Sequence, residues 1–215
     1  MEKIRLIKPD IHFNEIKEDF EYIFSSGIFS SGIFNKKLQK QLNKFLECKY
    51  SFLTSSATTA LWVSLKILGI KKGDEVIISD FSFPATANVV EDLGAKPIFA
   101  DVNLDTFNAS VSSIEKLISK KVKAVIFVDT FGNPSGLDLI SDLCSSYNIP
   151  LIEDAACAIG SKINNKMCGS ISDITCFSFH PRKLVCAGEG GAITTNNKEI
   201  SEILKIKLSH GGVKN

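Results

Sequence analysis

Short apolar runs alternate with longer amphipathic stretches over most of this chain. The short runs are rich in β-branched and aliphatic residues, and the stretches between them repeat apolar residues with helical spacing. Such alternation is typical of a mainly parallel sheet with helices on both faces, so we expect a three-layer α/β/α fold. The predicted strands are 50–54, 75–79, 96–100, 122–128, 150–153, 174–179 and 190–195, and the predicted helices are 58–68, 85–93, 111–118, 137–147 and 196–208.

Two more amphipathic helices are predicted before the first strand. Phe13, Ile16 and Phe20 recur with helical spacing within 12–26, and a second helix is expected over 34–46. The glycine-flanked segment 27–32 separates them and, by turn chemistry alone, is an ordinary connection between two helices. We therefore expect a helical arm at 1–48 and a larger domain at 49–215.

Composition and charge exclude several classes of protein. The chain has 215 residues, of which 44% are apolar, and a formal net charge of +1. That length is enough for one well-buried α/β domain, or for one domain and a fragment of another. The near-neutral charge, without a basic stripe, argues against a nucleic-acid partner. No apolar run approaches the length of a membrane span.

The cysteine and histidine pattern predicts neither a metal site nor a disulfide framework. Six cysteines form no CxxC pair, and three histidines give no zinc-ligand spacing. The first residues lack the uninterrupted apolar core of a signal peptide. Unpatterned cysteines without a secretion signal fit reduced thiols, so we expect a cytoplasmic protein.

One lysine, Lys183, lies where a predicted buried strand gives way to a glycine-rich turn, 188–191. An isolated lysine is most often a solvated surface residue. At a strand end, however, its side chain can enter a cleft, because ligands of open α/β sheets bind beyond the carboxyl ends of the strands. A lysine amine in such a cleft can act as a nucleophile toward carbonyl groups.

Two other segments also follow predicted strands. The segment 54–61 places small and hydroxyl residues at a helix start, which suits either a bound phosphate or simple capping by Ser56 or Thr58. Glu153 and Asp154 end another strand, and neighbours on a strand face opposite sides. A carboxylate there either caps the next segment or serves a bound group.

The sequence Ser-Phe-His-Pro-Arg-Lys at 178–183, followed by Gly-Glu-Gly-Gly at 188–191, resembles the cofactor-lysine segment of the DegT/DnrJ/EryC1/StrS sugar aminotransferases. The resemblance covers nearly the whole chain, from about residue 25 to residue 211. Members of this family use pyridoxal 5′-phosphate (PLP) and have the large domain of fold type I. Members are longer than this chain, so we expect it to be the large domain without the family's smaller C-terminal domain.

The resemblance also implies roles for individual residues. Lys183 would be the catalytic residue and hold PLP as a Schiff base. Asp154 would face the pyridine nitrogen and keep it protonated, with Glu153 pointing away. The implied cofactor-binding residues are Ala57 and Thr58 through their amides, Phe83 through ring stacking, Asp154, Cys157, Ser178 through its hydroxyl, and Lys183. The implied substrate contacts are Phe29, Ser30, His180 and Glu189.

Two positions depart from the family pattern. Cys157 stands where relatives usually carry Gln or His near the 3-oxygen of the cofactor, and its thiol can still donate a weak hydrogen bond. Asp129 stands where many relatives carry His. Both departures concern fine contacts rather than an element that the chemistry requires.

The function that follows is transfer of an amino group, usually from glutamate, to a nucleotide-linked keto sugar by a homodimer in the cytoplasm. Lys183 argues against the relatives that carry His there and catalyse dehydration. A first alternative is a catalytically incomplete fragment that needs its missing C-terminal portion or a partner chain. A second is a regulatory protein that binds the cofactor without turnover, although no DNA-binding helix pair supports it.

Overall fold

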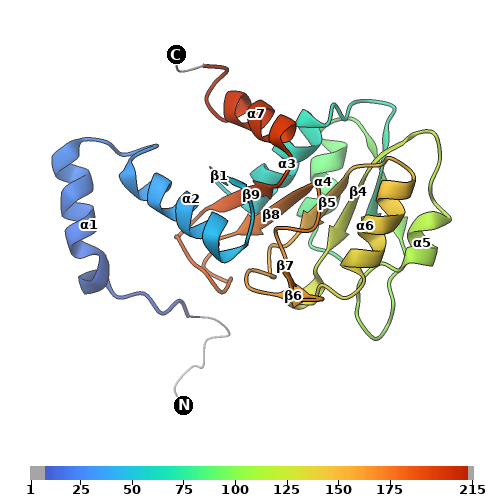
Figure 1. Ribbon diagram of the computed structural model, residues 1–215, viewed down its shortest axis with the longest axis horizontal. Coiled ribbons are helices and arrows are strands. Elements are labelled where there is room, and N and C mark those ends of the chain that lie inside the picture. The colour runs from blue at the N-terminus through green and yellow to red at the C-terminus, as the bar shows by residue number, and fades with distance from the viewer. Residues whose placement is uncertain (1–7, 213–215) are drawn as a thin grey trace.

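The computed structural model describes residues 8–212 (Figure 1). The first seven residues of the predicted arm, on which the signal-peptide interpretation largely depends, lie outside this range. The helices are α1 (Phe13–Ser26), α2 (Ile33–Phe45), α3 (Ala57–Ile67), α4 (Ala85–Glu91), α5 (Val111–Glu115), α6 (Leu137–Ser146), α7 (Lys198–Lys207) and the 3₁₀ turn η1 (Thr130–Gly132). The strands are β1 (Tyr50–Thr54), β2 (Glu75–Ser79), β3 (Lys96–Ala100), β4 (Val122–Val128), β5 (Leu151–Asp154), β6 (Lys162–Ile163), β7 (Lys166–Met167), β8 (Ile174–Ser178) and β9 (Gly191–Thr195).

A seven-stranded sheet with the order β1-β9-β8-β5-β4-β2-β3 forms the centre of the molecule. Strands β8, β5, β4, β2 and β3 pair in parallel, while β9 pairs antiparallel with both of its neighbours. The expected α/β fold with a mainly parallel sheet is confirmed. The carboxyl ends of β4, β5 and β8 therefore lie at the same edge of the sheet.

Alternating residues of the strands feed apolar clusters on opposite faces of the sheet. Ile126 and Ile152 pack with α3, α4 and α7 on one face, whereas Val125 and Phe127 pack with α5 and α6 on the other. A third cluster joins α2 to the segment between β5 and β8. The expected layers, with helices on both faces of the sheet, are thus present.

The N-terminal arm is only partly attached to this core. Helix α2 buries Leu42 against the third cluster, but α1 buries none of its residues. Figure 1 shows α1 at the blue end of the chain, apart from the sheet. In residues 8–212 no helix combines the length and the apolar character that crossing a membrane requires.

Candidate active site

A cavity of about 650 Å³ opens at the carboxyl ends of the parallel strands. Residues from β4, β5 and β8, from the start of α3 and from the loops around Phe83 and Lys183 line it. This is the edge of the sheet at which open α/β folds bind ligands. The lining residues that the sequence had singled out are Ser56, Ala57, Thr58, Phe83, Asp129, Asp154, Cys157, Ser178, His180, Lys183 and Glu189.

The first turn of α3 forms one wall of the cavity. Ser56 caps the helix, because its hydroxyl accepts a hydrogen bond from the amide of Thr59 at 3.1 Å. The first amides of an α-helix have no intrahelical acceptor, so those of Ala57 and Thr58 are available at the positive end of the helix dipole. Capping and anion binding are therefore compatible here, since they use different amides.

Gly191 on β9 allows this helix start to lie directly against the sheet. A β-carbon placed on Gly191 would come within 2.6 Å of the backbone carbon of Ser56 and 2.8 Å of the amide nitrogen of Ala57. Both are backbone atoms that cannot swing away. Only glycine permits this approach, which fixes the α3 amides beside the cavity.

Lys183 lies on a closed loop between β8 and β9. Backbone hydrogen bonds from Phe179 to Gly190 and from Ala187 to Phe179, at 2.8 and 2.9 Å, join the two ends of the loop. Gly188 adopts a φ of +80°, a conformation that favours glycine. The Lys183 ammonium enters the cavity and donates to the Cys157 thiol at 3.0 Å.

Asp154 supplies a buried carboxylate at the end of β5. Its Oδ2 accepts from the Thr86 hydroxyl at 3.0 Å, and its Oδ1 accepts from the Ala156 amide at 3.2 Å. Burial raises the pKa of Asp154, while these two hydrogen bonds and the charge of Lys183 act in the opposite direction. Glu153, its neighbour, turns toward Ser172 and Thr175 instead.

The remaining predicted residues are divided between the cavity and more distant positions. Phe83 lines the cavity and is 69% exposed, so its ring is accessible for stacking on a flat ligand. His180 and Glu189 both line it, with 3.7 Å between Nε2 and Oε1. Phe29 lines a separate small hollow within the arm. Ser30 lines neither this hollow nor the cavity.

Sequence reasoning missed several cavity residues, among them three with a charged or aromatic side chain. Arg182 adds a second positive side chain next to Lys183, and Phe81 and Phe131 add aromatic rings. The basic pair at 182–183 is the signal that could have indicated Arg182. The two rings contact each other, with 5.9 Å between centroids, although their segments are far apart in sequence.

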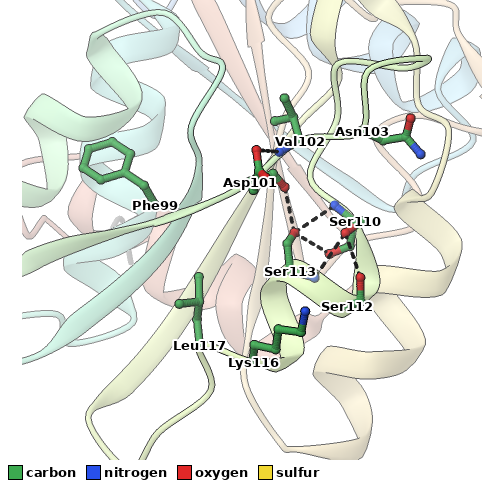
Figure 2. Close-up of a pocket in the computed structure, with 9 residues that line it drawn as sticks. All are labelled: Phe99, Asp101, Val102, Asn103, Ser110, Ser112, Ser113, Lys116 and Leu117. Carbon is green, nitrogen blue, oxygen red and sulfur yellow. Dashed lines mark hydrogen bonds between the residues drawn. The ribbon is translucent and has the colours of Figure 1, made fainter.

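A second hollow, of about 480 Å³, lies beside the start of α5 (Figure 2). Most of its hydroxyl groups are already hydrogen-bonded within the hollow. Ser110 and Ser113 form a reciprocal capping box, and the Ser113 hydroxyl also donates to the carbonyl of Asp101 at 2.7 Å. These bonds hold the short helix, and we assign no ligand to this hollow.

Known proteins resemble this chain in sequence and in fold. GDP-perosamine synthase of Vibrio cholerae is 34% identical over 98% of this chain and 57% of its own length. UDP-2-acetamido-2-deoxy-3-oxo-D-glucuronate aminotransferase of Pseudomonas aeruginosa is 38% identical over 81% of this chain and 49% of its own. The chain thus spans about half the length of these curated relatives.

A solved structure of Spr1654 from Streptococcus pneumoniae in its PLP form superimposes with a TM-score of 0.88. It is 29% identical, and the match covers 95% of this chain and 57% of that one. The sequence description of the DegT/DnrJ/EryC1/StrS aminotransferase family matches residues 10–215. With nearly the whole chain matched, the protein belongs to the DegT/DnrJ/EryC1/StrS aminotransferase family.

Proposed function

We propose that this chain is the cofactor-binding portion of a PLP-dependent aminotransferase that converts nucleotide-linked keto sugars to amino sugars. The observation that carries the proposal is the convergence of Lys183, Asp154 and the α3 amides in one cavity. The substrate class is supported by two relatives, whose names specify a GDP-linked and a UDP-linked sugar. The amino donor that we propose is glutamate.

The residues of the cavity fit PLP. The free amides of Ala57 and Thr58, with the Ser178 hydroxyl, suit a phosphate at a helix N-terminus. The exposed ring of Phe83 suits stacking on a pyridine, and the buried carboxylate of Asp154 suits its protonated nitrogen. When bound, PLP supplies an electron sink for the negative charge that develops at the donor's α-carbon.

Lys183 performs the proton transfer in this proposal. Its side chain reaches the cavity from a loop that is closed at both ends, so its amine is held near the reacting atoms. The free amine takes the proton from the donor's α-carbon as a general base and returns a proton as a general acid. Cys157, 3.0 Å from this amine, holds the side chain between these steps.

The sugar substrate would meet the other side of the cavity. His180 and Glu189 face each other there, and Arg182 adds a positive charge that suits a diphosphate group. Phe29 and Ser30 lie in the arm and would contact substrate only if the arm of a second copy covered the cavity. We accordingly propose that the protein is a homodimer and that it is located in the cytoplasm. Sedimentation of the purified protein can test the dimer.

A second candidate is a chain that binds PLP but does not complete the reaction by itself. The observation that favours it is the position of Phe29 and Ser30, which lie outside the cavity in the described residues. The two candidates share the cofactor site and differ in turnover. Measurements of cofactor binding and of the reaction with glutamate therefore separate them.

The proposed experiment is an absorbance titration of the purified protein with PLP. Covalent attachment to Lys183 should produce a visible band that Lys183→Ala lacks, because no other amine enters this cavity in the described residues. Lys166→Ala, at an exposed position of the short strand β7, is the matched control and should keep the band. Loss of the band on adding glutamate supports turnover. A band that is stable to glutamate supports the second candidate, in which the chain binds PLP but does not complete the reaction by itself. If folded wild-type protein shows no band with PLP, both candidates are contradicted.

A further inference from the structure

Three titratable side chains meet at the side of the cavity where β4 and β5 end. The carboxyl groups of Asp129 and Glu153 and the thiol of Cys168 have atoms that all lie within 4.8 Å of one another. All three residues are buried, and Asp129 is only 1% exposed although it borders the cavity. The residues are far apart in sequence, which is why no spacing pattern revealed them.

The hydrogen bonds of this cluster are unevenly distributed. Oε2 of Glu153 accepts from the hydroxyls of Thr175 and Ser172 at 2.7 and 3.1 Å, and from the amide of Gly169 at 3.4 Å. Oε1 of Glu153 and both carboxyl oxygens of Asp129 are buried, and no donor reaches them in the described part of the chain. Buried carboxylate oxygens without a donor are costly, because burial removes the hydration of their charge.

No cation offsets the charge of the pair. Neither Asp129 nor Glu153 takes part in an ion pair within residues 8–212. The other ionisable groups that face Asp129 are Asp154, which would repel a charge on it, and the Cys168 thiol. One proton placed between the two carboxyls removes a negative charge and gives both of them a hydrogen bond.

The surroundings also indicate which residue carries the proton. Burial, strengthened by the charges of Glu153 and Asp154, raises the pKa of Asp129 well above its ordinary value. Burial raises the pKa of Glu153 too, but its proximity to Asp129 and the hydrogen bonds that it accepts from Thr175, Gly169 and Ser172 oppose that effect. Burial raises the pKa of the Cys168 thiol as well, so it stays protonated.

We propose that Asp129 carries one proton shared with Glu153, donates it to Oε1 of Glu153, and acts as a neutral positioning residue beside Asp154. The backbone amide of Asp129 also donates to the carbonyl of Asp154 at 3.1 Å, so the pair holds together the two strand ends that border the cavity. A neutral Asp129 adds no second negative charge next to Asp154. Only the role of Asp154 toward a pyridine nitrogen rests on the proposed function.

Infrared spectroscopy of the purified chain without PLP tests the proton directly. At neutral pH, wild type should show the C=O stretch of a buried carboxylic acid, and Asp129→Asn should lack it. Glu153→Gln should keep a band at a different frequency, because burial and the charge of Asp154 still raise the pKa of Asp129, which then donates to the amide oxygen of the new side chain. Asp142→Asn, an exposed site on α6, is the matched control and should keep the band. Absence of the band from wild type, or its persistence in Asp129→Asn, overturns the proposal.

The pH dependence of unfolding tests the hydrogen bond. A carboxyl whose pKa is raised by folding stabilises the protein at low pH, and this contribution is lost as pH rises from about 4 through the folded-state pKa. The midpoint of urea unfolding should therefore fall less steeply over this range in Asp129→Asn than in wild type. At neutral pH, Asp129→Asn should unfold at a higher urea concentration than Asp129→Ala, because its amide still donates to Glu153.

Two results of these experiments would contradict the shared proton. Equal midpoints for Asp129→Asn and Asp129→Ala at neutral pH would show that no hydrogen bond to Glu153 is made. In a further experiment, the protein is incubated with zinc and then dialysed. If wild type retains stoichiometric zinc and Asp129→Ala does not, the cluster binds a cation instead. Because none of these measurements involves PLP, their failure is distinct from a failure of the proposed function.

Discussion

Asp154 and Glu153 are adjacent in sequence but meet different surroundings. The alternation of a strand sends Asp154 toward Thr86 on α4 and Glu153 toward Thr175 on β8. The sequence alone predicted this divergence. It did not predict the contact between Glu153 and Asp129, because that contact depends on the register of β4 and β5, in which Phe127 pairs with Glu153.

At the residue scale, the hydrogen bond from Thr86 should hold the Asp154 carboxylate in place. Thr86→Val keeps the shape of the side chain but removes the donor to Oδ2, which should cost about 2 kcal/mol of unfolding free energy. Weaker PLP binding should accompany this loss. Urea unfolding and a PLP titration provide the two measurements.

Ser82→Ala is the control for Thr86→Val. The Ser82 hydroxyl lies 2.7 Å from that of Thr86 but makes no hydrogen bond to Asp154 in the described residues. Its removal should therefore change PLP binding much less. If both variants behave alike, the hydrogen bond from Thr86 is not what holds Asp154.

At the element scale, the close packing of β9 against the start of α3 positions the proposed phosphate site. Gly191→Ala would force its new methyl group against the backbone of Ser56, Ala57 and Phe177. We expect a loss of about 1–3 kcal/mol of unfolding free energy, typical of overpacking, together with weaker binding of PLP. Thermal unfolding and a PLP titration check these two effects.

Gly32→Ala tests whether any added methyl group has this effect. The nearest atom to a β-carbon at Gly32 is the Cγ2 atom of Ile28, at 3.3 Å, which belongs to a side chain in the arm. This variant should keep wild-type binding of PLP. An equal loss of PLP binding in Gly32→Ala and Gly191→Ala would mean that the close packing of β9 against α3 is not what positions the phosphate site.

Most elements could be predicted from the sequence because their apolar patterns are long enough to show a period. Strands 50–54, 75–79, 96–100 and 122–128 are confirmed residue by residue. The hairpin of β6 and β7 was missed, because two-residue strands show no alternation. Its turn uses Asn164 and Asn165 at positive φ, a conformation that Asn tolerates well. The helix predicted over 111–118 ends at Glu115.

The candidate site was predicted less completely than the fold. Lys183 and Asp154 were identified through a family resemblance, and the structure brings them to one cavity. Phe81 and Phe131 were missed because their contact joins loops from different strands. Phe29 and Ser30 lie away from the cavity because α1, which precedes them, buries no residue against the sheet.

At the scale of the whole molecule, burial should divide the six cysteines into two classes. Cys157 is exposed and Cys186 is half-buried, whereas the other four are buried. Burial raises the pKa of Cys48 to about 11 and of Cys144 to about 12, and it raises those of Cys168 and Cys176 as well. A buried thiol with a raised pKa reacts slowly, because the thiolate is the nucleophile.

Iodoacetamide at neutral pH should therefore modify Cys157 and Cys186 before the other four cysteines. Peptide mass spectrometry after a short exposure measures this order, and the same reaction in urea should modify all six. Fast labelling of Cys168 or Cys176 in the folded protein would contradict the described core.

Lys183 is the proposed attachment site of the cofactor, and peptide mapping after borohydride reduction identifies the residue to which the cofactor attaches. The protein is incubated with PLP, treated with borohydride, digested and analysed by mass spectrometry. A pyridoxyl group should appear on the peptide that contains Lys183 and should be absent from Lys183→Ala. A pyridoxyl group on other lysines only, or an equal distribution over many lysines, would contradict the assignment of Lys183.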